Sequence, residues 1–567
     1  MAPGIRPIVS PSNHPWLLLL VLVPWLIYYS TGKEGLDYGF HWDEPARVTH
    51  VIYSLHKGVL LPGDYLYPGL LYWLHYMALV PDIPAALRDA EARHMKLPDV
   101  QINELRQRYN NAAYGRMNQQ ERELYDKASY VPWVGEYMQG VLVDKLFNQR
   151  LRNICLFLSS LTIFFGALIV YVWRHNSIEA LAAACFIAFS WEFAYHGRWI
   201  ATDAILCTFC ILTILFLVVT WKRPQASGWL YAAAAAAGLA TGTKYTAGIL
   251  LFIVLGTAIL RARETTAWCQ LPMQLGICFL AFGLIFYLTT PAILLDPIRF
   301  FESLSNQQYV YSHADGAVNA MNPGWDHLSR NLYYVIAVLS SPYRILALFT
   351  FLLSAVGFYH ALREMKWIGL VIFSYPLLLV YLISTQCLFN VRNLLPFLPF
   401  MAVTASVGAG CLIGRLRAPF QRAAWGGIAV MITINAGWLI HAAETIQQRG
   451  TDAFMRDVAH YVQSENNTPI YLSPVVSDLV SRMGIVTKSN LTTNFNESKV
   501  ALFTMHEAWN DQRSWYQAAP FVKGDWFGPY EVNLNMYPAW GGDNRVMRMN
   551  TRDARRIGLP ASMKALK

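Results

Sequence analysis

Charged residues are scarce in this chain. Asp, Glu, Lys and Arg make up 14% of its 567 residues, whereas hydrophobic residues make up 55%. Soluble domains carry roughly one quarter charged residues, so this composition excludes a string of soluble domains with ordinary polar surfaces. A chain with this balance is expected to bury much of its apolar surface in lipid.

Cysteines are also few, and the C-terminal part of the chain has none. The last of the eight cysteines is Cys411, so no disulfide framework can hold the segment from residue 442 onward. Cys207 and Cys210 have the spacing of a redox or metal motif, but they lie inside an apolar run, where packing is the better interpretation. We find no internal repeat and one low-complexity tract, Ala232–Ala237, whose small side chains predict close helix packing.

Long apolar runs recur along the chain. The first run ends in two tyrosines without a small-residue cleavage site, so we expect it to be an uncleaved anchor. Most runs are long enough to cross about 30 Å of hydrocarbon, and together they predict about eleven membrane spans. The runs are 16–29, 151–173, 177–195, 203–221, 229–243, 245–260, 271–290, 344–360, 367–384, 394–414 and 423–441.

Basic residues mark one side of these predicted spans. If the N-terminus is cytoplasmic, alternate connections are short and basic, as the positive-inside rule requires. These connections carry Arg174, Lys222, Arg223, Arg261, Arg263, Arg363, Lys366, Arg415, Arg417 and Arg422. This placement accounts for the net charge of +9 without a nucleic-acid partner. The sequence predicts a multi-pass protein, in the cytoplasmic membrane, with its C-terminal segment outside.

The outer side receives the larger segments. Residues 31–150 form the first outer loop, in which the aromatic part 39–80 predicts amphipathic helices at the interface and the charged part 82–130 predicts solvated helical faces. The tail has a helix-like segment at 452–464 and strand-like runs at 469–473 and 500–504. The predicted fold is an all-α polytopic membrane bundle, residues 1–441, followed by a small extracytoplasmic α/β domain, residues 442–567.

Several ionisable residues recur at the outer boundary of the predicted spans. They are Asp43, Glu44, Arg47, Arg198, Asp203, Lys244, His313 and Arg392. Each cation could be an interfacial anchor or a member of an intramembrane ion pair. Carboxylates lack the long stems with which Lys and Arg reach water, so Asp43 and Asp203 point more strongly to function.

Six sequence motifs occur in order between residues 15 and 440. They are DEPARV, YLYPGLLYWL, GRWIATDA, AGLATGTKYTAGILL, TTPAILLDPIRF and VRNLLPFLPF. With this topology the chain resembles the membrane glycosyltransferases of the C superfamily, specifically the phospholipid-carrier-dependent enzymes related to protein O-mannosyltransferases and the aminoarabinose transferase of lipid A. Compact relatives lack the charged stretch 82–150, which we interpret as an insertion.

The resemblance implies transfer of a sugar from a polyprenyl-phosphate carrier to a hydroxyl of a lipid, glycan or protein acceptor. Asp43 would be the base, with Glu44 as a supporting neighbour and Asp203 orienting the acceptor or the sugar. Lys244, Arg198 and Arg392 would bind the carrier phosphate, with Arg47 and His313 as further candidates. The resemblance implies no certain cofactor, and a divalent metal ion held by Asp43 and Asp203 is an open alternative.

The residue types fit this chemistry on physical grounds. Phosphate is a tolerable leaving group, so its departure needs cations more than a general acid. One carboxylate that accepts the hydroxyl proton then suffices for a single inverting displacement. The alternative class is a transporter or lipid flippase, but such proteins often contain repeated halves. Here the candidate charges cluster at one face, beside large outer segments, which favours an enzyme.

Overall fold

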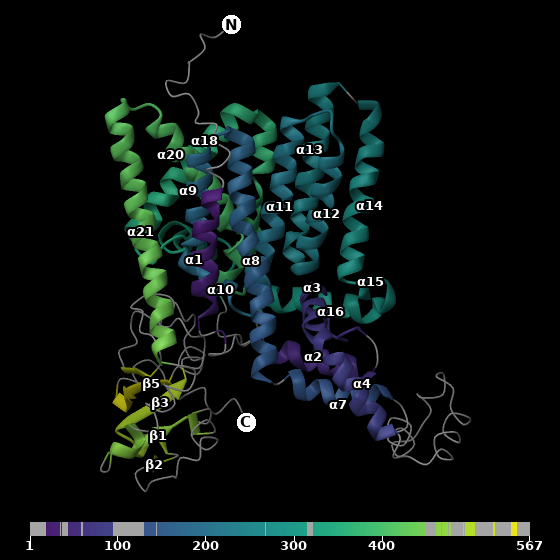
Figure 1. Ribbon diagram of the computed structural model, residues 1–567, viewed down its shortest axis with the longest axis vertical. Coiled ribbons are helices and arrows are strands. Elements are labelled where there is room, and N and C mark those ends of the chain that lie inside the picture. The colour runs from purple at the N-terminus through teal and green to yellow at the C-terminus, as the bar shows by residue number, and fades with distance from the viewer. Residues whose placement is uncertain are drawn as a thin grey trace, which may run out of the picture.

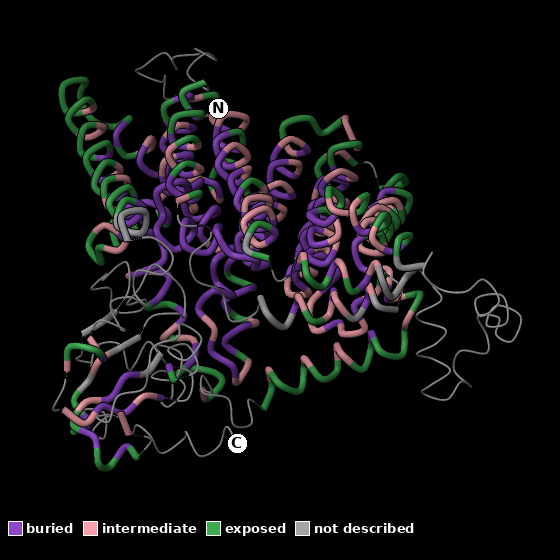
Figure 2. Tube along the Cα trace, turned by 60° about the horizontal axis from the view of Figure 1, so that its bottom comes forward, coloured by how far each residue is buried: buried purple, intermediate pink, exposed green. Residues whose placement is uncertain are grey.

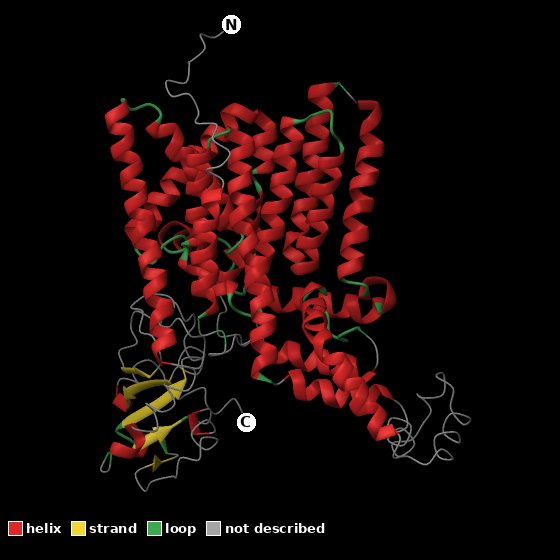
Figure 3. Ribbon diagram, in the orientation of Figure 1, coloured by secondary structure: helices red, strands yellow, loops and turns green. Residues whose placement is uncertain are grey.

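The computed structural model is a bundle of long helices with a smaller layer of helices and a β-sheet at one end (Figure 1). Helices dominate the chain, and the few short strands all lie in the C-terminal region (Figure 3). The structure describes residues 19–34, 36, 44–57, 60–94, 130–142, 144–266, 268–313, 321–449, 461–465, 468–473, 476–477, 491–492, 494–504, 525–527 and 546–552.

The bundle is built from apolar helices whose ends carry recognisable signals. Asp144 and Asn176 cap α8 and α9 by accepting hydrogen bonds from backbone N–H groups of the first helical turn. The helices are α1 (Leu22–Lys33), α8 (Lys145–Arg174), α9 (Ser177–Ala188), α10 (Trp191–Gly197), α11 (Thr202–Lys222), α12 (Gly228–Thr243), α13 (Ile249–Thr265), α14 (Leu271–Thr289), α18 (Arg344–Ile372), α19 (Tyr375–Ser384), α20 (Phe397–Ile413) and α21 (Ala418–Arg449).

Seven of the described helices are long and apolar enough to cross a membrane, or eight if the bent pair α9–α10 counts as one span. The expectation of about eleven spans therefore stays a prediction. Two shorter apolar helices, α19 and α20, fall below the length limit. The expected span 177–195 is broken by a 60° bend between α9 and α10. At the expected break after residue 360, α18 is kinked at Lys366, which has a positive φ of 52°.

Burial separates the centre of the bundle from its rim. In the most apolar 18-residue stretch of α11, 72% of the residues are buried. In the corresponding stretch of the helical segment Trp268–Thr289, which contains α14, 11% are buried. Figure 2 shows buried positions where helices face one another and exposed positions along the outer helices. The surface of α14 is thus available to lipid, while α11 is enclosed by protein.

Small residues allow the closest helix contacts. A Cβ atom added at Gly357 of α18 would overlap the carbonyl oxygen of Thr404 in α20, and one added at Gly408 would overlap the carbonyl oxygen of Leu353. The hydroxyls of Ser354 and Thr404 lie 2.7 Å apart in the same interface. In α12 the predicted packing of the alanine tract is observed, since Ala233, Ala234, Ala236 and Ala237 are all buried.

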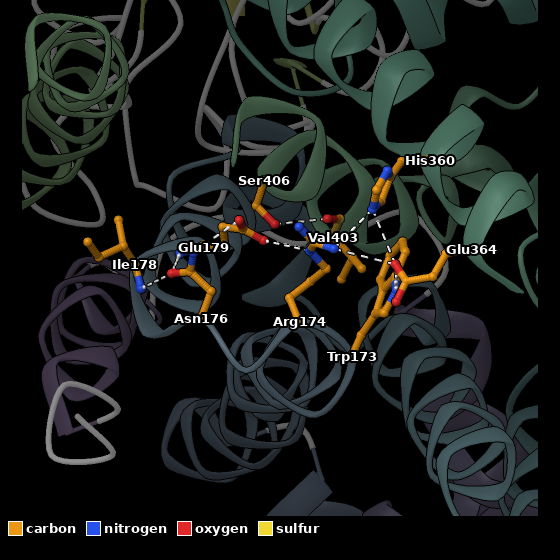
Figure 4. Close-up of polar contacts among 9 residues, drawn as sticks. All are labelled: Trp173, Arg174, Asn176, Ile178, Glu179, His360, Glu364, Val403 and Ser406. Carbon is orange, nitrogen blue, oxygen red and sulfur yellow. Dashed lines mark hydrogen bonds and ion pairs between the residues drawn. The ribbon is translucent and has the colours of Figure 1, made fainter. Parts of the chain in front are cut away.

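A polar cluster joins α8, α9 and α18 at the end of the bundle where α8 ends (Figure 4). Arg174, at the end of α8, lies 3.3 Å from Glu179 of α9 and 3.4 Å from Glu364 of α18. The indole nitrogen of Trp173 donates a hydrogen bond to Glu364, and His360 lies 3.2 Å from the same carboxylate. Paired in this way, the charges fix α8, α9 and α18 to one another.

A second layer of helices lies across the opposite end of the bundle (Figure 1). It contains α2 (Glu44–Lys57), α3 (Leu70–Leu79), η2 (Val80–Asp82), α4 (Ile83–His94), α7 (Tyr130–Leu142), α15 (Ala292–Leu295) and α16 (Pro297–His313). The helices expected from 39–80 are thus found at this end as α2 and α3. Connecting helices are η4 (Tyr245–Gly248), η5 (Trp268–Gln270), α17 (Trp325–Ala337) and η6 (Val391–Leu394).

Five short strands follow α21 and form one mixed sheet. They are β1 (Ile470–Leu472), β2 (Leu491–Thr492), β3 (Val500–Thr504), β4 (Asp525–Phe527) and β5 (Val546–Asn550), in the order β2-β1-β3-β5-β4. Strand β1 pairs in parallel with β2 and β3, whereas β5 pairs antiparallel with β3 and β4. The sheet lies at the same end of the bundle as α2 and α7 (Figure 1). The domain boundary at 441/442 stays a prediction, and α21 itself continues to Arg449. The expected helix 452–464 falls mostly outside the described residues.

We predict that Gly357→Ala lowers the free energy of unfolding of the purified protein by about 1–3 kcal/mol, because the added methyl group overpacks the α18–α20 interface. Gly283→Ala in α14 is the matched control, since a Cβ atom there meets nothing within 4 Å. Thermal unfolding in detergent measures both. Equal melting temperatures for the two variants would contradict this account of the interface.

Candidate functional site

A buried ion pair connects α11 with the end of α12. Asp203 lies in the first turn of α11 and is 1% exposed. The Lys244 ammonium donates a hydrogen bond of 2.6 Å to its carboxylate. Lys244 follows α12 directly, in extended conformation, so its cation lies near the negative end of that helix dipole. The positive end of the α11 dipole therefore stabilises the Asp203 carboxylate, and the negative end of the α12 dipole stabilises the Lys244 ammonium.

A third segment completes this cluster from far along the chain. The Lys244 ammonium also donates a hydrogen bond of 2.6 Å to the side-chain oxygen of Asn393 in η6. The neighbouring Arg392 has its Nε atom 4.0 Å from the Asp203 carboxylate and is also buried. Three of the ordered sequence motifs thus meet at one point. Asp203 thus pairs with Lys244 and holds its ammonium in place.

Arg47 ties the first outer loop to this cluster. Its guanidinium donates a 2.8 Å hydrogen bond to the carbonyl oxygen of Ile200, three residues before Asp203. It also lies over the ring of Tyr67, 4.6 Å from the ring centre. Arg47 is one helical turn from Glu44, the first residue of α2. The contact therefore holds the start of α2 beside the loop that enters α11.

The remaining predicted residues have different surroundings. Asp43 lies outside the described residues, and of Glu44 the structure describes the backbone at the start of α2. Arg198 donates a 2.6 Å hydrogen bond to the carbonyl oxygen of Glu34, which fixes the end of the first span to α10. His313 is exposed at the end of α16, where its ring stacks on Tyr309. The structure thus brings together Asp203, Lys244 and Arg392, and Arg47 contacts the chain just before Asp203.

A cavity of about 290 Å³ opens beside Lys244, close to the lower limit of the usual range for ligand pockets. Apart from Lys244, its lining is rich in amides, phenols and apolar groups. The lining residues are Leu66, Tyr67, Pro68, Lys244, Tyr245, Thr246, Leu304, Gln307, Gln308, Tyr311 and Gln386. The cavity therefore offers one cation together with several neutral hydrogen-bonding groups.

Residues 66–68 form one wall of this cavity, and the chain that follows them is fixed to the end of α14. The backbone N–H of Gly69 donates to the Thr290 hydroxyl, and the Trp73 indole donates to the carbonyl oxygen of Thr289. A Cβ atom at Gly69 would overlap that same carbonyl oxygen, so the chain needs glycine for this close approach. Two more of the ordered motifs, YLYPGLLYWL and TTPAILLDPIRF, meet here.

The same wall is joined to α2 by an ion pair. His50 lies 3.1 Å from Asp64. Partial burial raises the pKa of Asp64, but hydrogen bonds from His50 and from the backbone N–H of Leu66 outweigh burial and bring the pKa below its ordinary value. Asp64 is therefore ionised at neutral pH and accepts these bonds. The interaction holds the wall against the helix that begins next to Asp43.

Sequence reasoning missed the uncharged members of this site. They are Tyr67, Tyr245, Gln307, Gln308, Tyr311, Gln386 and Asn393. Tyr67, Tyr245 and Asn393 belong to three of the ordered motifs. Tyr245 directly follows Lys244, and Asn393 directly follows Arg392, and this adjacency to a charged residue was the available signal. The glutamines carried no signal, because Gln307 and Gln308 lie on an amphipathic helix and Gln386 follows α19, and an amide is ordinary in either place.

A second buried polar group was also missed. Glu192 of α10 accepts a 2.8 Å hydrogen bond from the Tyr334 hydroxyl and lies 3.3 Å from His196. All three side chains are almost fully buried. They join α10 to α17 next to the bend in the broken span, so their contacts fix the segment that leads to Asp203.

Cysteines and residues of metal-binding types occur in the described part of the chain. No group of three or more His, Cys, Asp and Glu side chains there could hold a metal ion. A metal shared by Asp43 and Asp203 stays a prediction, because Asp43 is not described. All eight cysteines are free, and both Cys207 and Cys210 are buried within α11, as the packing interpretation requires.

Comparison with known proteins gives one family match. A family model described as dolichyl-phosphate-mannose-protein mannosyltransferase matches residues 130–291, which include Arg198, Asp203 and Lys244. No curated protein sequence matches the chain. The family match bears out the resemblance to membrane glycosyltransferases that the motifs indicate, and with it the prediction of an enzyme.

Solved structures match the chain at low sequence identity and with TM-scores below 0.5. ArnT from Cupriavidus metallidurans bound to undecaprenyl phosphate has 13% sequence identity and a TM-score of 0.45, and the match covers 95% of this chain and 98% of that one. The oligosaccharyltransferase AglB from Archaeoglobus fulgidus, in complex with an inhibitory peptide and a dolichol-phosphate, has 12% identity and a TM-score of 0.43. That match covers 86% of this chain and 61% of the other.

We predict that Lys244→Met destabilises the protein by about 3 kcal/mol, because the buried Asp203 carboxylate loses its closest cation. Adding Asp203→Asn should recover most of this loss, since no uncompensated charge then remains. Thermal unfolding measures both variants, with Lys222→Met at the exposed far end of α11 as the control. A double variant as unstable as Lys244→Met alone would contradict the pairing.

Proposed function

We propose that this protein is a glycosyltransferase that moves a sugar from a polyprenyl-phosphate carrier to an acceptor hydroxyl at the outer membrane face. The observation that carries the proposal is the cavity beside Lys244, whose cation is held in place by Asp203 and Asn393. The family match over residues 130–291 supports the same reaction class.

Lys244 is the proposed ligand of the carrier phosphate, with Arg392 as its neighbour. The ammonium has three donors and uses two of them on Asp203 and Asn393, so the third can be directed to a phosphate oxygen. A charge-assisted hydrogen bond of this kind stabilises the phosphate as negative charge develops on it. Because Asp203 and Asn393 fix the ammonium beforehand, little reorganisation is needed when the bond to the sugar breaks.

Asp43 is the proposed base, with Glu44 beside it. Its carboxylate takes the proton of the acceptor hydroxyl while that oxygen attacks the anomeric carbon. The bond from the anomeric carbon to the phosphate oxygen breaks at the same time, and its electron pair leaves with the polyprenyl phosphate. One displacement inverts the configuration at the anomeric carbon. The contact of Arg47 with Ile200 supports this role, since it holds the start of α2 near Asp203.

The neutral part of the cavity is the proposed sugar site. Gln307, Gln308 and Gln386 provide amide donors and acceptors, and Tyr311 and Tyr245 add phenol groups on the same lining. Amides and phenols pair with sugar hydroxyls, which also act as both donors and acceptors. The sugar would therefore lie between these groups with its anomeric carbon toward Lys244.

The proposed membrane topology has about eleven spans, with the N-terminus in the cytoplasm of a cytoplasmic-membrane protein. The layer that contains α2, α7 and α16, together with the C-terminal sheet, would then lie outside. The common location of that layer and the sheet at one end of the bundle supports this arrangement (Figure 1). The cluster around Arg174 lies at the other end, where the positive-inside rule puts the basic loops.

We predict that Asp43→Asn lowers sugar transfer from a labelled polyprenyl-phosphate donor by about 10²–10⁴-fold, because a positioned general base contributes that much. Donor binding, assayed on the same purified variant, should be retained. Asp144→Asn is the matched control, since asparagine caps α8 as well as aspartate does.

Two results would count against the role of Asp43. Turnover within a few-fold of wild type would reject it as the base and direct attention to Asp203. Loss of donor binding together with turnover would indicate a metal-binding or structural role.

The topology makes a separate prediction. Cys269, exposed in η5 between α13 and α14, should react with a membrane-impermeant maleimide only after cells are permeabilised. In a Cys387→Ser background, Lys499→Cys at the exposed edge of β3 should react in intact cells. Labelling of both positions from the same side would show that the proposed orientation is wrong.

A further inference from the structure

Helices α15 and α16 present an apolar surface away from the cavity. Leu294, Leu295, Ile298 and Phe301 are all exposed, from 57% for Phe301 to 74% for Ile298. Ile298 and Phe301 lie about one helical turn apart on α16, and Leu294 and Leu295 end α15 just before it. Four large exposed apolar side chains in so short a stretch mark an interaction surface rather than scattered exposure.

The other face of α16 belongs to the protein. Phe300 is 2% exposed and packs near Tyr65 and Tyr245, with ring centres 6.2 and 6.1 Å away. Leu304, Gln307 and Tyr311 continue this face at intervals of three and four residues and line the cavity. The helix therefore separates the cavity from whatever covers Ile298 and Phe301.

Both ends of α16 are fixed to the bundle. At the start, Asp296 accepts a 3.0 Å hydrogen bond from the Tyr65 hydroxyl, and the Ser303 hydroxyl accepts one from the Tyr65 backbone. At the end, the backbone N–H of Cys387 donates a 2.7 Å hydrogen bond to the carbonyl oxygen of Tyr311. The exposed apolar face is thus held outward by contacts on the opposite side of the helix.

This face continues the lipid-facing surface of α14. Leu280, Leu284 and Leu288 are exposed at intervals of four residues along α14, and α15 begins three residues after that helix ends. Figure 1 shows α14 running lengthwise in the bundle and α15 and α16 lying across its end. A helix that turns across the end of a span, with one apolar and one polar face, has the form of an interfacial membrane helix.

One tyrosine and one arginine of α16 fit the same location. Tyr309 lies on the same side of the helix as Ile298, farther along the helix, and is exposed. Tyrosine prefers the boundary between hydrocarbon and headgroups. Arg299 is exposed next to Ile298, and its long side chain can place its charge among lipid phosphates while its stem stays in apolar surroundings.

We propose that α15 and the first half of α16 bind the surface of the lipid bilayer through Leu294, Leu295, Ile298 and Phe301. The occupant of this face is the acyl and headgroup boundary of the leaflet at the outer end of α14. In consequence, α16 is the wall between the membrane and the cavity beside Lys244. This inference stands apart from the proposed reaction, because it concerns what covers the helix and not what is transferred.

Site-specific photocrosslinking tests the proposal without an activity assay. The photoreactive residue p-benzoylphenylalanine replaces Ile298 in the full-length protein, which is placed in vesicles of phosphatidylethanolamine and phosphatidylglycerol. Leu284 of α14 is the lipid-facing control position, and Lys499 beside β3 is the solvent-facing control. After irradiation, mass spectrometry of the protein identifies the crosslinked partner.

We expect phospholipid adducts at position 298 with a yield within about three-fold of that at 284, and none at 499. Absence of lipid adducts at 298 while they form at 284 would overturn the proposal. Adducts at 298 to a second copy of the chain would also overturn it, because the face would then be a protein interface. Because Ile298 is exposed, the replacement is expected to fold, and thermal unfolding of the same sample verifies this.

Discussion

The hydrogen-bonded ion pair between Lys244 and Asp203 is the interaction on which the rest of the site depends. Two opposite charges are stable in a buried environment only when each is paired and hydrogen-bonded, so their positions leave little freedom to the helices that carry them. The pair fixes the end of α12 against the start of α11, and Asn393 adds η6 to the same point. The cavity exists beside Lys244 because these three helix ends cannot separate without exposing an unpaired charge.

The scaffold around this pair is built from close contacts between helix backbones. In α12, a Cβ atom at Gly238 or Gly242 would collide with α14, so both glycines bring α14 near the cation. The end of α14 then anchors Gly69 and Trp73, which follow the cavity-lining residues 66–68 in the chain. The chain that leaves α14 becomes α15 and α16, so the cavity and the proposed lipid-facing surface are two sides of one helix. A change in how α16 meets the bilayer would therefore move residues such as Gln307 that line the cavity.

Much of the charged part of the site could be predicted, because isolated charges at the ends of apolar runs are conspicuous. Asp203, Lys244 and Arg392 were singled out in this way, and the structure places them together. Arg198 and His313 had the same signal, but Arg198 donates to the carbonyl oxygen of Glu34 and lies over the Trp199 ring, and His313 stacks on Tyr309. Sequence position alone cannot separate a cation that faces a carboxylate from one that fixes a neighbouring loop. The glutamines of α16 could not be predicted, since their importance comes from facing a cavity formed by other segments.

The sequence by itself predicted a helical membrane protein, with basic connections on one side and large segments on the other. These properties are local, since each follows from hydropathy and charge over one stretch of chain in contact with lipid or water. The tertiary structure alone decided that α9 and α10 form a bent pair, that α16 lies across the end of α14, and which charges meet. Lys244 is 41 residues from Asp203 and 149 from Asn393. No local pattern specifies such a contact, because it depends on the packing of every helix between the two residues.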